Sequence, residues 1–146
     1  AIIANRGFYF TPHIVKSVEG NEKIDTTFLE KKYTTINPKH FDVIIEGMEK
    51  VIKQSDGTAN NIKSNSISIC GKTGTAQNPH GEDHSIFIAF APKENPEIAI
   101  AVYIENGGWG STWAAPIAGL MIEKYLKADI NLDVEKFIKN GVINSK

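Results

Sequence analysis

Three features are scarce in this 146-residue sequence: cysteine, an excess of charge of one sign, and long hydrophobic runs. The single cysteine, Cys70, excludes an internal disulfide and a zinc site made of cysteines alone. The 16 basic and 17 acidic residues give a net charge of −1, which argues against nucleic acid as the main partner, because phosphates require a basic surface. No stretch approaches the roughly 18 consecutive apolar residues of a membrane-spanning helix.

An initiator methionine and a signal peptide are also missing from the beginning of the sequence. Residues 1–7 instead have the pattern of the last turn of a helix that ends near Gly7. We therefore expect the chain to begin inside a structural element, so the lack of targeting signals says little about the intact protein.

The first half of the sequence contains one strong structural signal and two weak ones. A short strand is expected within residues 8–19, and an irregular segment or weak hairpin within residues 21–36. Asn37 and Pro38 then suit the start of an amphipathic helix, because asparagine caps helices and proline fits the first helical position. Gly57 is expected to follow its end.

Three strands in quick succession are predicted over residues 67–75, 85–91 and 97–105, each rich in β-branched or alternating apolar residues. The connections between them are short, and short connections favour antiparallel neighbours.

A glycine-rich loop over residues 106–110 precedes the last strong helix, which we expect Ser111 or Thr112 to cap. The predicted order is helix end, strand, helix, three antiparallel strands and helix. This order favours an α+β fold, in which helices pack on an antiparallel sheet. Residues 1–127 are expected to form this folded part, and residues 128–146 a polar C-terminal tail.

The run Gly71-Lys72-Thr73-Gly74-Thr75 ends the first of these three strands and carries the clearest chemical signal. Lysine supplies a positive charge, and the threonines supply hydroxyl and backbone N–H groups. Glycine leaves room for an extended peptide to pair with the strand. The run therefore favours a sheet edge that binds an anion, and a backbone N–H in it can stabilise an oxyanion.

A phosphate-binding P-loop is the alternative interpretation of the same lysine and threonine. That loop requires a glycine five positions before Gly71, where Ser66 stands, and a helix after the motif. Residues 66–70 have a strand pattern instead, so a P-loop nucleotide-binding domain is a remote alternative.

Four other groups of residues invite a functional interpretation. The histidines and acids of residues 80–84 favour a solvated loop over a metal site, because their spacing matches no strong zinc pattern. Cys70 is expected to be a small buried strand residue. Trp109 and Trp113 are expected to pack the last helix onto the sheet, with an exposed contact as the alternative for Trp109. One aromatic residue of the run 8–10 is expected to be exposed.

The motif and its surroundings resemble a known family, the penicillin-binding proteins and serine β-lactamases, whose third signature motif is Lys-Thr-Gly. Residues 71–77 resemble that motif, and residues 56–59 resemble the Gly-Thr-Ala segment that precedes it in class B transpeptidases. Residues 87–92 and 98–102 are similar to the next two strands. Residues 105–108 and 115–118 resemble the turn and C-terminal helix of the elongation-type enzymes, the penicillin-binding protein 2 group. Residues 1–12 resemble the Ala-Asn-Gly-Gly segment and proline found downstream of the family's second motif.

The resemblance assigns a role to each residue of the motif. Lys72 is implied to set the electrostatics of the cleft and to assist proton transfer. Thr73 and Thr75 are implied to hydrogen-bond the carboxylate of the peptide or β-lactam beside Gly74. The backbone N–H of Thr75 is implied to form half of the oxyanion hole.

The residues that perform acylation in the family are not found in this sequence. The family requires a Ser-x-x-Lys motif, whose serine is acylated, and a Ser-x-Asn motif across the cleft. Ser17 and Ser55 have no lysine three residues on, and Ser64-Asn65-Ser66 has no asparagine in third place. No nucleophile is therefore assigned in this chain, which we expect to be inactive alone.

The resemblance implies a peptidoglycan D,D-transpeptidase that cross-links stem peptides through a serine acyl-enzyme and needs no cofactor or metal. Its expected partners are stem peptides, β-lactams, the missing N-terminal half of the domain and the cell-elongation machinery. Its expected location is the periplasm, on a protein anchored in the bacterial inner membrane. A non-catalytic peptide-binding or assembly module that uses the same strand edge remains the main alternative.

Overall fold

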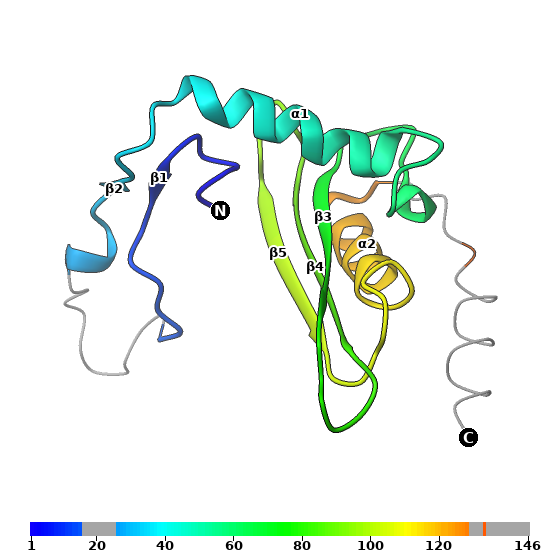
Figure 1. The fold of residues 1–146 in the computed structure, drawn as a ribbon. Coiled ribbons are helices and arrows are strands. Elements are labelled where there is room, and N and C mark those ends of the chain that lie inside the picture. Colours follow the sequence, from blue (N-terminus) through cyan, green and yellow to red (C-terminus); the bar gives the residue numbers. More distant parts are fainter. Residues whose placement is uncertain (16–25, 129–132, 134–146) are drawn as a thin grey trace.

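The structure is a computed structural model that describes residues 1–15, 26–128 and 133 (Figure 1). The predicted α+β architecture is confirmed, with helices packed against an antiparallel sheet. Short 3-10 turns occur at Thr26–Phe28 and Asn60–Ile62. The main elements are β1 (Phe8–Tyr9), β2 (Lys32–Tyr33), α1 (Lys39–Lys53), β3 (Cys70–Ala76), β4 (His84–Ala91), β5 (Ile98–Ile104) and α2 (Ala114–Leu126).

The central sheet has the order β3-β4-β5, with both pairs antiparallel. Thr73 lies opposite Phe87 of β4, and Phe87 lies opposite Val102 of β5. Within the described residues, β3 and β5 each pair along one side only, so both are edge strands. A separate two-stranded ribbon pairs β1 with β2.

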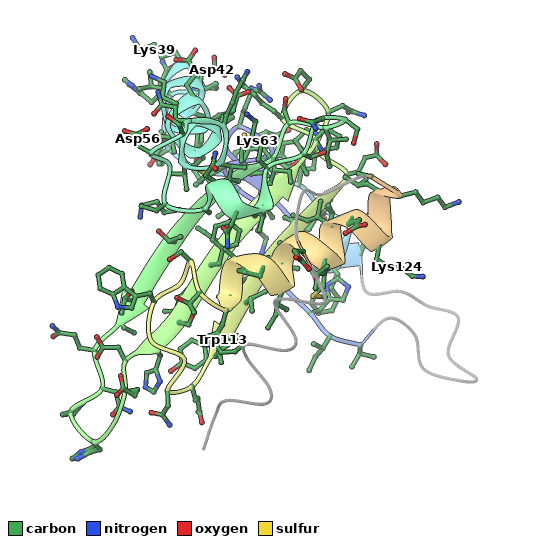
Figure 2. All side chains as sticks on the ribbon, turned by 90° about the vertical axis from the view of Figure 1, so that its right-hand side faces the viewer. Lys39, Asp42, Asp56, Lys63, Trp113 and Lys124 are labelled. Atoms are coloured by element: carbon green, nitrogen blue, oxygen red, sulfur yellow. The ribbon has the colours of Figure 1, made fainter. Side chains whose placement is uncertain are left out.

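Helix α2 covers one face of the sheet and runs along it from Trp113 at its start to Lys124 near its end (Figure 2). The face of β4 beneath it carries Phe87, Ala89 and Ala91, which are all buried. The side chains of α2 at this contact are small, which lets the helix backbone lie close to the strand. They are Ala114, Ala115, Ala118 and the larger Ile122, each fully buried.

Helix α1 lies across one end of the three strands (Figure 1). Its buried side chains Phe41, Ile45 and Met48 form a second apolar cluster with Cys70 and Phe90 of the sheet. Burial of a side chain of this size stabilises a fold by about 1.5–3 kcal/mol. Helix α1 therefore anchors the start of β3.

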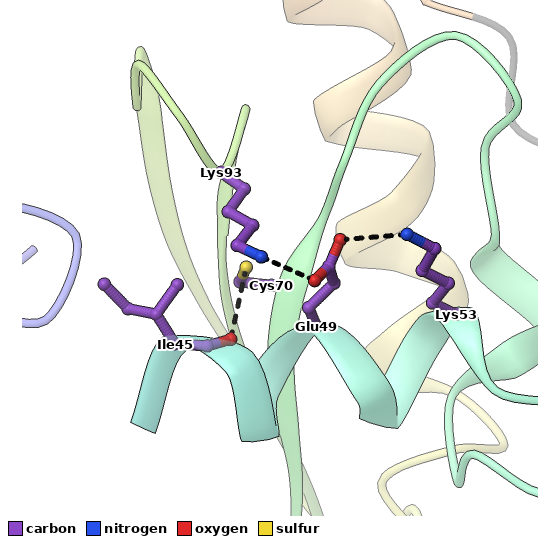
Figure 3. A network of polar contacts seen from close by, with 5 residues as sticks. All are labelled: Ile45, Glu49, Lys53, Cys70 and Lys93. Carbon is purple, nitrogen blue, oxygen red and sulfur yellow. Dashed lines mark hydrogen bonds and ion pairs between the residues drawn. The ribbon is translucent and has the colours of Figure 1, made fainter. Parts of the chain in front are cut away.

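A small polar network ties α1 to the turn between β4 and β5 (Figure 3). The carboxylate of Glu49 accepts a bond from Lys93 Nζ at 2.6 Å and one from Lys53 Nζ at 3.4 Å. Lys93 also donates its backbone N–H to the Ser68 carbonyl at 2.9 Å, beside the start of β3.

The structure confirms one predicted cap and corrects another. The backbone of Pro38, directly before Lys39, is already helical, and the Asn37 side chain accepts the Lys39 N–H at 3.1 Å, as a residue capping from that position does. The predicted cap of α2 at Ser111 or Thr112 is wrong, because the helix begins after Trp113, which makes no side-chain cap bond. The buried hydroxyl of Ser85 in β4 accepts the Ala114 N–H at 3.3 Å instead.

One predicted strand is shorter than expected, and a second prediction is only partly covered by the described residues. Strand β3 begins at Cys70 rather than Ile67, because the Ser64 hydroxyl accepts the N–H groups of Ser66 and Ile67 and holds them in a turn. The short strand predicted within residues 8–19 is present as Phe8–Tyr9, and residues 16–19 lie outside the described residues. The predicted tail after Ala128 also lies largely outside them.

The chain begins with hydrogen-bonded turns, as its sequence predicts. The N–H of Gly7 donates to the Ile2 carbonyl, and that of Arg6 to the Ile3 carbonyl, which is the bond pattern of a helix C-terminus. Among the described residues, no helix combines the length and the apolar character needed to cross a membrane.

Substitution Gly71→Ala is expected to destabilise the protein. A Cβ at Gly71 would overlap the Phe87 ring and lie 3.2 Å from Ile52 Cδ1, in the core between β3, β4 and α1. Overpacking of this kind costs about 1–3 kcal/mol. Urea unfolding should show a midpoint shifted to lower denaturant.

Gly47→Ala is the matched control, because a Cβ at this exposed position of α1 meets nothing within 4 Å. It should stabilise the helix by about 0.5–1 kcal/mol. Equal effects of the two substitutions would contradict the packing described for Gly71.

The Glu49 network predicts a pH dependence of stability. The hydrogen bond from Lys93 is the main cause that holds the pKa of Glu49 below its ordinary value of 4.5. The folded state therefore binds this proton less readily than the unfolded state. The resulting stabilisation is present above pH 4.5 and is lost as the pH falls through the lower folded pKa.

Glu49→Gln should lower the thermal midpoint at neutral pH and should reduce the further loss that wild type suffers on acidification to about pH 3. Lys53→Gln is the control, because the Lys53 side chain is 70% exposed and its contact is longer. An acid transition that is the same in wild type and Glu49→Gln would rule out this network as its source.

Candidate functional site

Strand β3 carries the Lys-Thr-Gly run along the free edge of the sheet. Lys72 and Thr75 are exposed, whereas Thr73 and Gly74 are half-buried. Lys72 Nζ donates to the backbone carbonyl of Thr73 at 2.7 Å. The lysine therefore lies in the middle of a strand, which continues to Ala76 and leads through a turn to β4.

This position excludes the P-loop alternative. A P-loop lysine lies at the start of a helix, whose N-terminal amides surround the phosphate. The element after Lys72 is the rest of β3, and no helix intervenes before β4.

The glycine loop after β5 shows how the backbone of β3 is oriented. A Cβ at Gly110 would overlap the Ile86 carbonyl oxygen and lie 2.6 Å from the Gly74 carbonyl oxygen. One added atom would therefore touch the carbonyls of both Gly74 and Ile86, which lie opposite each other in β3 and β4. Both carbonyls must point into the space between the two strands, as they do in a hydrogen-bonded antiparallel pair. Backbone groups alternate in direction along a strand, so those of Thr73 and Thr75 point to the free edge. The reach of Lys72 Nζ to the Thr73 carbonyl agrees with this orientation.

The side chains of the motif divide between the two faces of the sheet, because successive strand residues alternate. Thr73 and Thr75 lie on the α2 face, opposite Phe87 and Ser85. Lys72 lies on the other face, opposite Ile88. The hydroxyl of Thr73 is 3.1 Å from the hydroxyl of Thr58, which comes from the turn after α1.

The face that carries Lys72 is largely uncovered in the described residues. Ile88 is 41% exposed and Tyr103 is 55% exposed. A groove of about 720 Å³ lies on this face, between the sheet and the N-terminal segment. Phe10, 42% exposed, lines the groove and is the exposed aromatic residue predicted for residues 8–10.

The loops at the far end of β3 are joined by polar side chains. Asn78 Nδ2 donates to Asn106 Oδ1 at 2.8 Å, and Asp83 Oδ1 accepts the Asn78 N–H at 3.1 Å. His84 Nδ1 accepts the Asn106 N–H at 3.1 Å. The two bonds to Asn106 join the β3–β4 turn and the start of β4 to the β5–α2 loop, and the Asn78–Asp83 bond closes the turn itself.

The same turn contains the histidines and acids considered as metal ligands. The described part of the chain holds no group of three or more histidine, cysteine or carboxylate side chains placed to bind a metal. Asp83 and His84 act in the loop contacts, and His80 is exposed.

Trp109 corrects a prediction made from the sequence. Packing of the last helix onto the sheet was the favoured expectation, but the Trp109 side chain is 76% exposed, as the alternative had it. Its backbone carbonyl accepts the Ser85 hydroxyl at 2.9 Å, so the loop is held by its backbone and the indole faces solvent. Trp113 is half-buried at the start of α2.

Two side chains of nucleophilic type lie close to the motif, and neither is available. Cys70 is fully buried, as predicted, and donates its thiol to the Ile45 carbonyl at 3.7 Å. Burial is the main cause that raises the pKa of this thiol to about 12, so the thiolate is essentially absent at neutral pH. Ser85, opposite Thr75, is fully buried and bonded to Trp109 and Ala114.

The sequence did not single out Thr58, Ser85 or the Asn78–Asn106 pair as parts of the site. Thr58 lies in the segment that resembles the family, but no local pattern shows that it meets Thr73, 15 residues away. Ser85 and Asn106 act through contacts that depend on strand register and loop conformation, so they have no signal in a single sequence.

A family model and a curated relative both identify this chain as similar to penicillin-binding transpeptidases. The family model of the penicillin-binding protein transpeptidase domain matches residues 1–123. The peptidoglycan D,D-transpeptidase MrdA of Haemophilus influenzae is 31% identical, over 93% of this chain and 24% of that protein.

Two solved structures share the fold. The PBP2 of Pseudomonas aeruginosa, in complex with WCK 5153, is 35% identical with a TM-score of 0.72, covering 86% of this chain and 27% of that one. The imipenem acyl-enzyme of penicillin-binding protein A from Mycobacterium tuberculosis is 32% identical with a TM-score of 0.63, covering 86% of this chain and 28% of that one.

The chain thus spans about a quarter of the length of these relatives. The family model covers most of its residues, and its β3-β4-β5 sheet and two helices belong to a fold shared with solved penicillin-binding proteins. This chain belongs to the penicillin-binding protein transpeptidase family, as part of a PBP2-type transpeptidase domain.

Proposed function

We propose that the free edge of β3 binds the carboxylate of a stem peptide or β-lactam, and that a serine outside this chain is acylated. The observation that carries the proposal is the one-sided pairing of β3. It leaves the backbone groups of Thr73 and Thr75 facing outward, beside two threonine hydroxyls and one lysine.

Each residue of the edge has a distinct role in this proposal. The hydroxyls of Thr73 and Thr75 donate to the carboxylate, and charge-assisted bonds of this kind are stronger than neutral ones. Lys72 contributes a positive charge from the opposite face and assists proton transfer. Gly74 leaves the edge free of a side chain where the ligand backbone lies alongside. The outward N–H of Thr75 donates to the oxyanion of the tetrahedral intermediate.

The whole protein in this proposal is a D,D-transpeptidase that cross-links peptidoglycan stem peptides through a serine acyl-enzyme. Residues 1–127 form the C-terminal half of its catalytic domain, and residues 128–146 a polar tail. The other half supplies the serine and covers the groove on the Lys72 face. The protein is anchored in the inner membrane with this domain in the periplasm, where it works with the cell-elongation machinery and needs no cofactor.

A non-catalytic peptide-binding module is the second candidate. The free edge of β3 supports it, because strand addition to such an edge binds extended peptides without any nucleophile. The two candidates differ in whether the protein forms a covalent adduct with penicillin.

Covalent labelling with a fluorescent penicillin tests the proposal. The longer protein should be labelled, and the 146-residue chain should not, because the proposed serine lies outside it. Thr73→Val in the longer protein should slow labelling by about 10- to 100-fold, the value of one hydrogen bond to a charged group.

The isosteric valine keeps the shape of the strand, so folding should be preserved. An unlabelled longer protein would favour the binding module. Labelling of the chain alone would contradict the assignment of the nucleophile to another part of the protein.

A further inference from the structure

The hydroxyl of Thr73 already has a partner before any ligand binds. Thr58 Oγ1 lies 3.1 Å from Thr73 Oγ1, and either oxygen can be the donor in this contact. The proposed function does not use Thr58. It requires only that Thr73 direct its proton at a carboxylate, and a threonine hydroxyl has a single proton to donate.

The turn that carries Thr58 is fixed to the end of α1. The N–H of Ala59 donates to the Val51 carbonyl at 3.0 Å. Asn60 Nδ2 donates to the carbonyls of Ile52 and Gln54, at 3.2 Å and 2.9 Å. These bonds satisfy carbonyls at the helix C-terminus that otherwise lack partners.

The turn is also held by residues that are buried in the hydrophobic core. Ala59 and Ile62 are both fully buried, in the cluster that contains Phe87. The Thr58 backbone therefore has little freedom, although its side chain is exposed. A hydroxyl held in this way stays beside the Thr73 hydroxyl at low entropic cost.

The direction of the two protons decides what Thr73 can do. If Thr73 donates to Thr58, its proton is turned away from the ligand. If Thr58 donates, the Thr73 proton is free to point at a carboxylate, and the chain from Thr58 to Thr73 to carboxylate is mutually polarised. A bound carboxylate accepts but cannot donate, so it favours the second arrangement.

We propose that Thr58 is a positioning residue for ligand binding: it donates to Thr73 Oγ1 and directs the Thr73 proton to the carboxylate. This inference rests on the proposed function, because it assumes that Thr73 binds a carboxylate. Thr58 acts through Thr73 alone, so its effect should vanish wherever the Thr73 hydroxyl or the ligand carboxylate is absent.

The test measures the rate of acylation of the longer protein by benzylpenicillin and, at higher concentration, by its methyl ester, which lacks the free carboxylate. Thr58→Val should slow acylation by the acid about 3- to 10-fold, the value of one ordinary hydrogen bond, and should leave the ester rate unchanged. Thr58→Ser keeps the hydroxyl and should restore the wild-type rate.

A double-mutant cycle provides the decisive comparison. In a Thr73→Val background, Thr58→Val should have no further effect on acylation, whereas a residue that acts independently would show an additive loss. The thermal midpoint of Thr58→Val should stay near that of wild type, because the substitution removes an exposed hydroxyl.

Equal slowing with acid and ester, or an additive effect with Thr73→Val, would overturn the inference and leave the proposed function intact. A wild-type protein that benzylpenicillin does not acylate would overturn both.

Discussion

One-sided pairing of β3 is the constraint on which the rest of this structure depends. A strand in the middle of a sheet uses all its backbone groups on its neighbours, whereas an edge strand leaves every second residue with a free N–H and carbonyl. Strand β3 bonds to β4 along one side, and the groups of Thr73 and Thr75 point away. An exposed edge usually favours aggregation, because another chain can pair with it. A short strand that carries a lysine limits such pairing, so β3 can keep a free edge that is compatible with ligand binding.

The packing around β3 holds this edge in place without covering it. Gly71 lets the Phe87 ring pack against the strand, and Gly110 brings the β5–α2 loop against the Gly74–Ile86 pair. Helix α1 and the Glu49–Lys93 ion pair hold the start of the strand, and the Asn78–Asn106 contact joins the loops at its end. The contacts that support β3 therefore lie along its paired side and at both of its ends, and within the described residues no strand pairs with its other side.

The sequence predicted the elements that rest on strong periodicity. The helix after Asn37, the three strands and the last helix were all expected, because amphipathic spacing and short turns are local signals. The sheet edge at the motif was predicted from the residue types of the motif itself, and β3 is an edge strand within the described residues. The family resemblance supplied the identity of the motif, which composition and spacing alone left open between an anion-binding edge and a P-loop.

The features that the sequence did not predict depend on contacts between distant residues. The hydroxyl of Ser85 caps α2 from another element, and no inspection of residues 111–113 reveals it. The exposure of Trp109 follows from the loop backbone being held through its carbonyl, which an aromatic residue beside a helix does not signal. The Thr58–Thr73 contact likewise requires the turn after α1 to fold back onto β3.

The central claim is that the free edge of β3 binds a carboxylate for a nucleophile located elsewhere in the protein. A crystal structure of the longer protein acylated by a β-lactam tests this most directly. The carboxylate should lie within hydrogen-bond distance, about 3 Å, of the Thr73 and Thr75 hydroxyls, with the acyl oxygen at the Thr75 N–H. A carboxylate bound away from β3, or an edge of β3 covered by another strand, would contradict the claim.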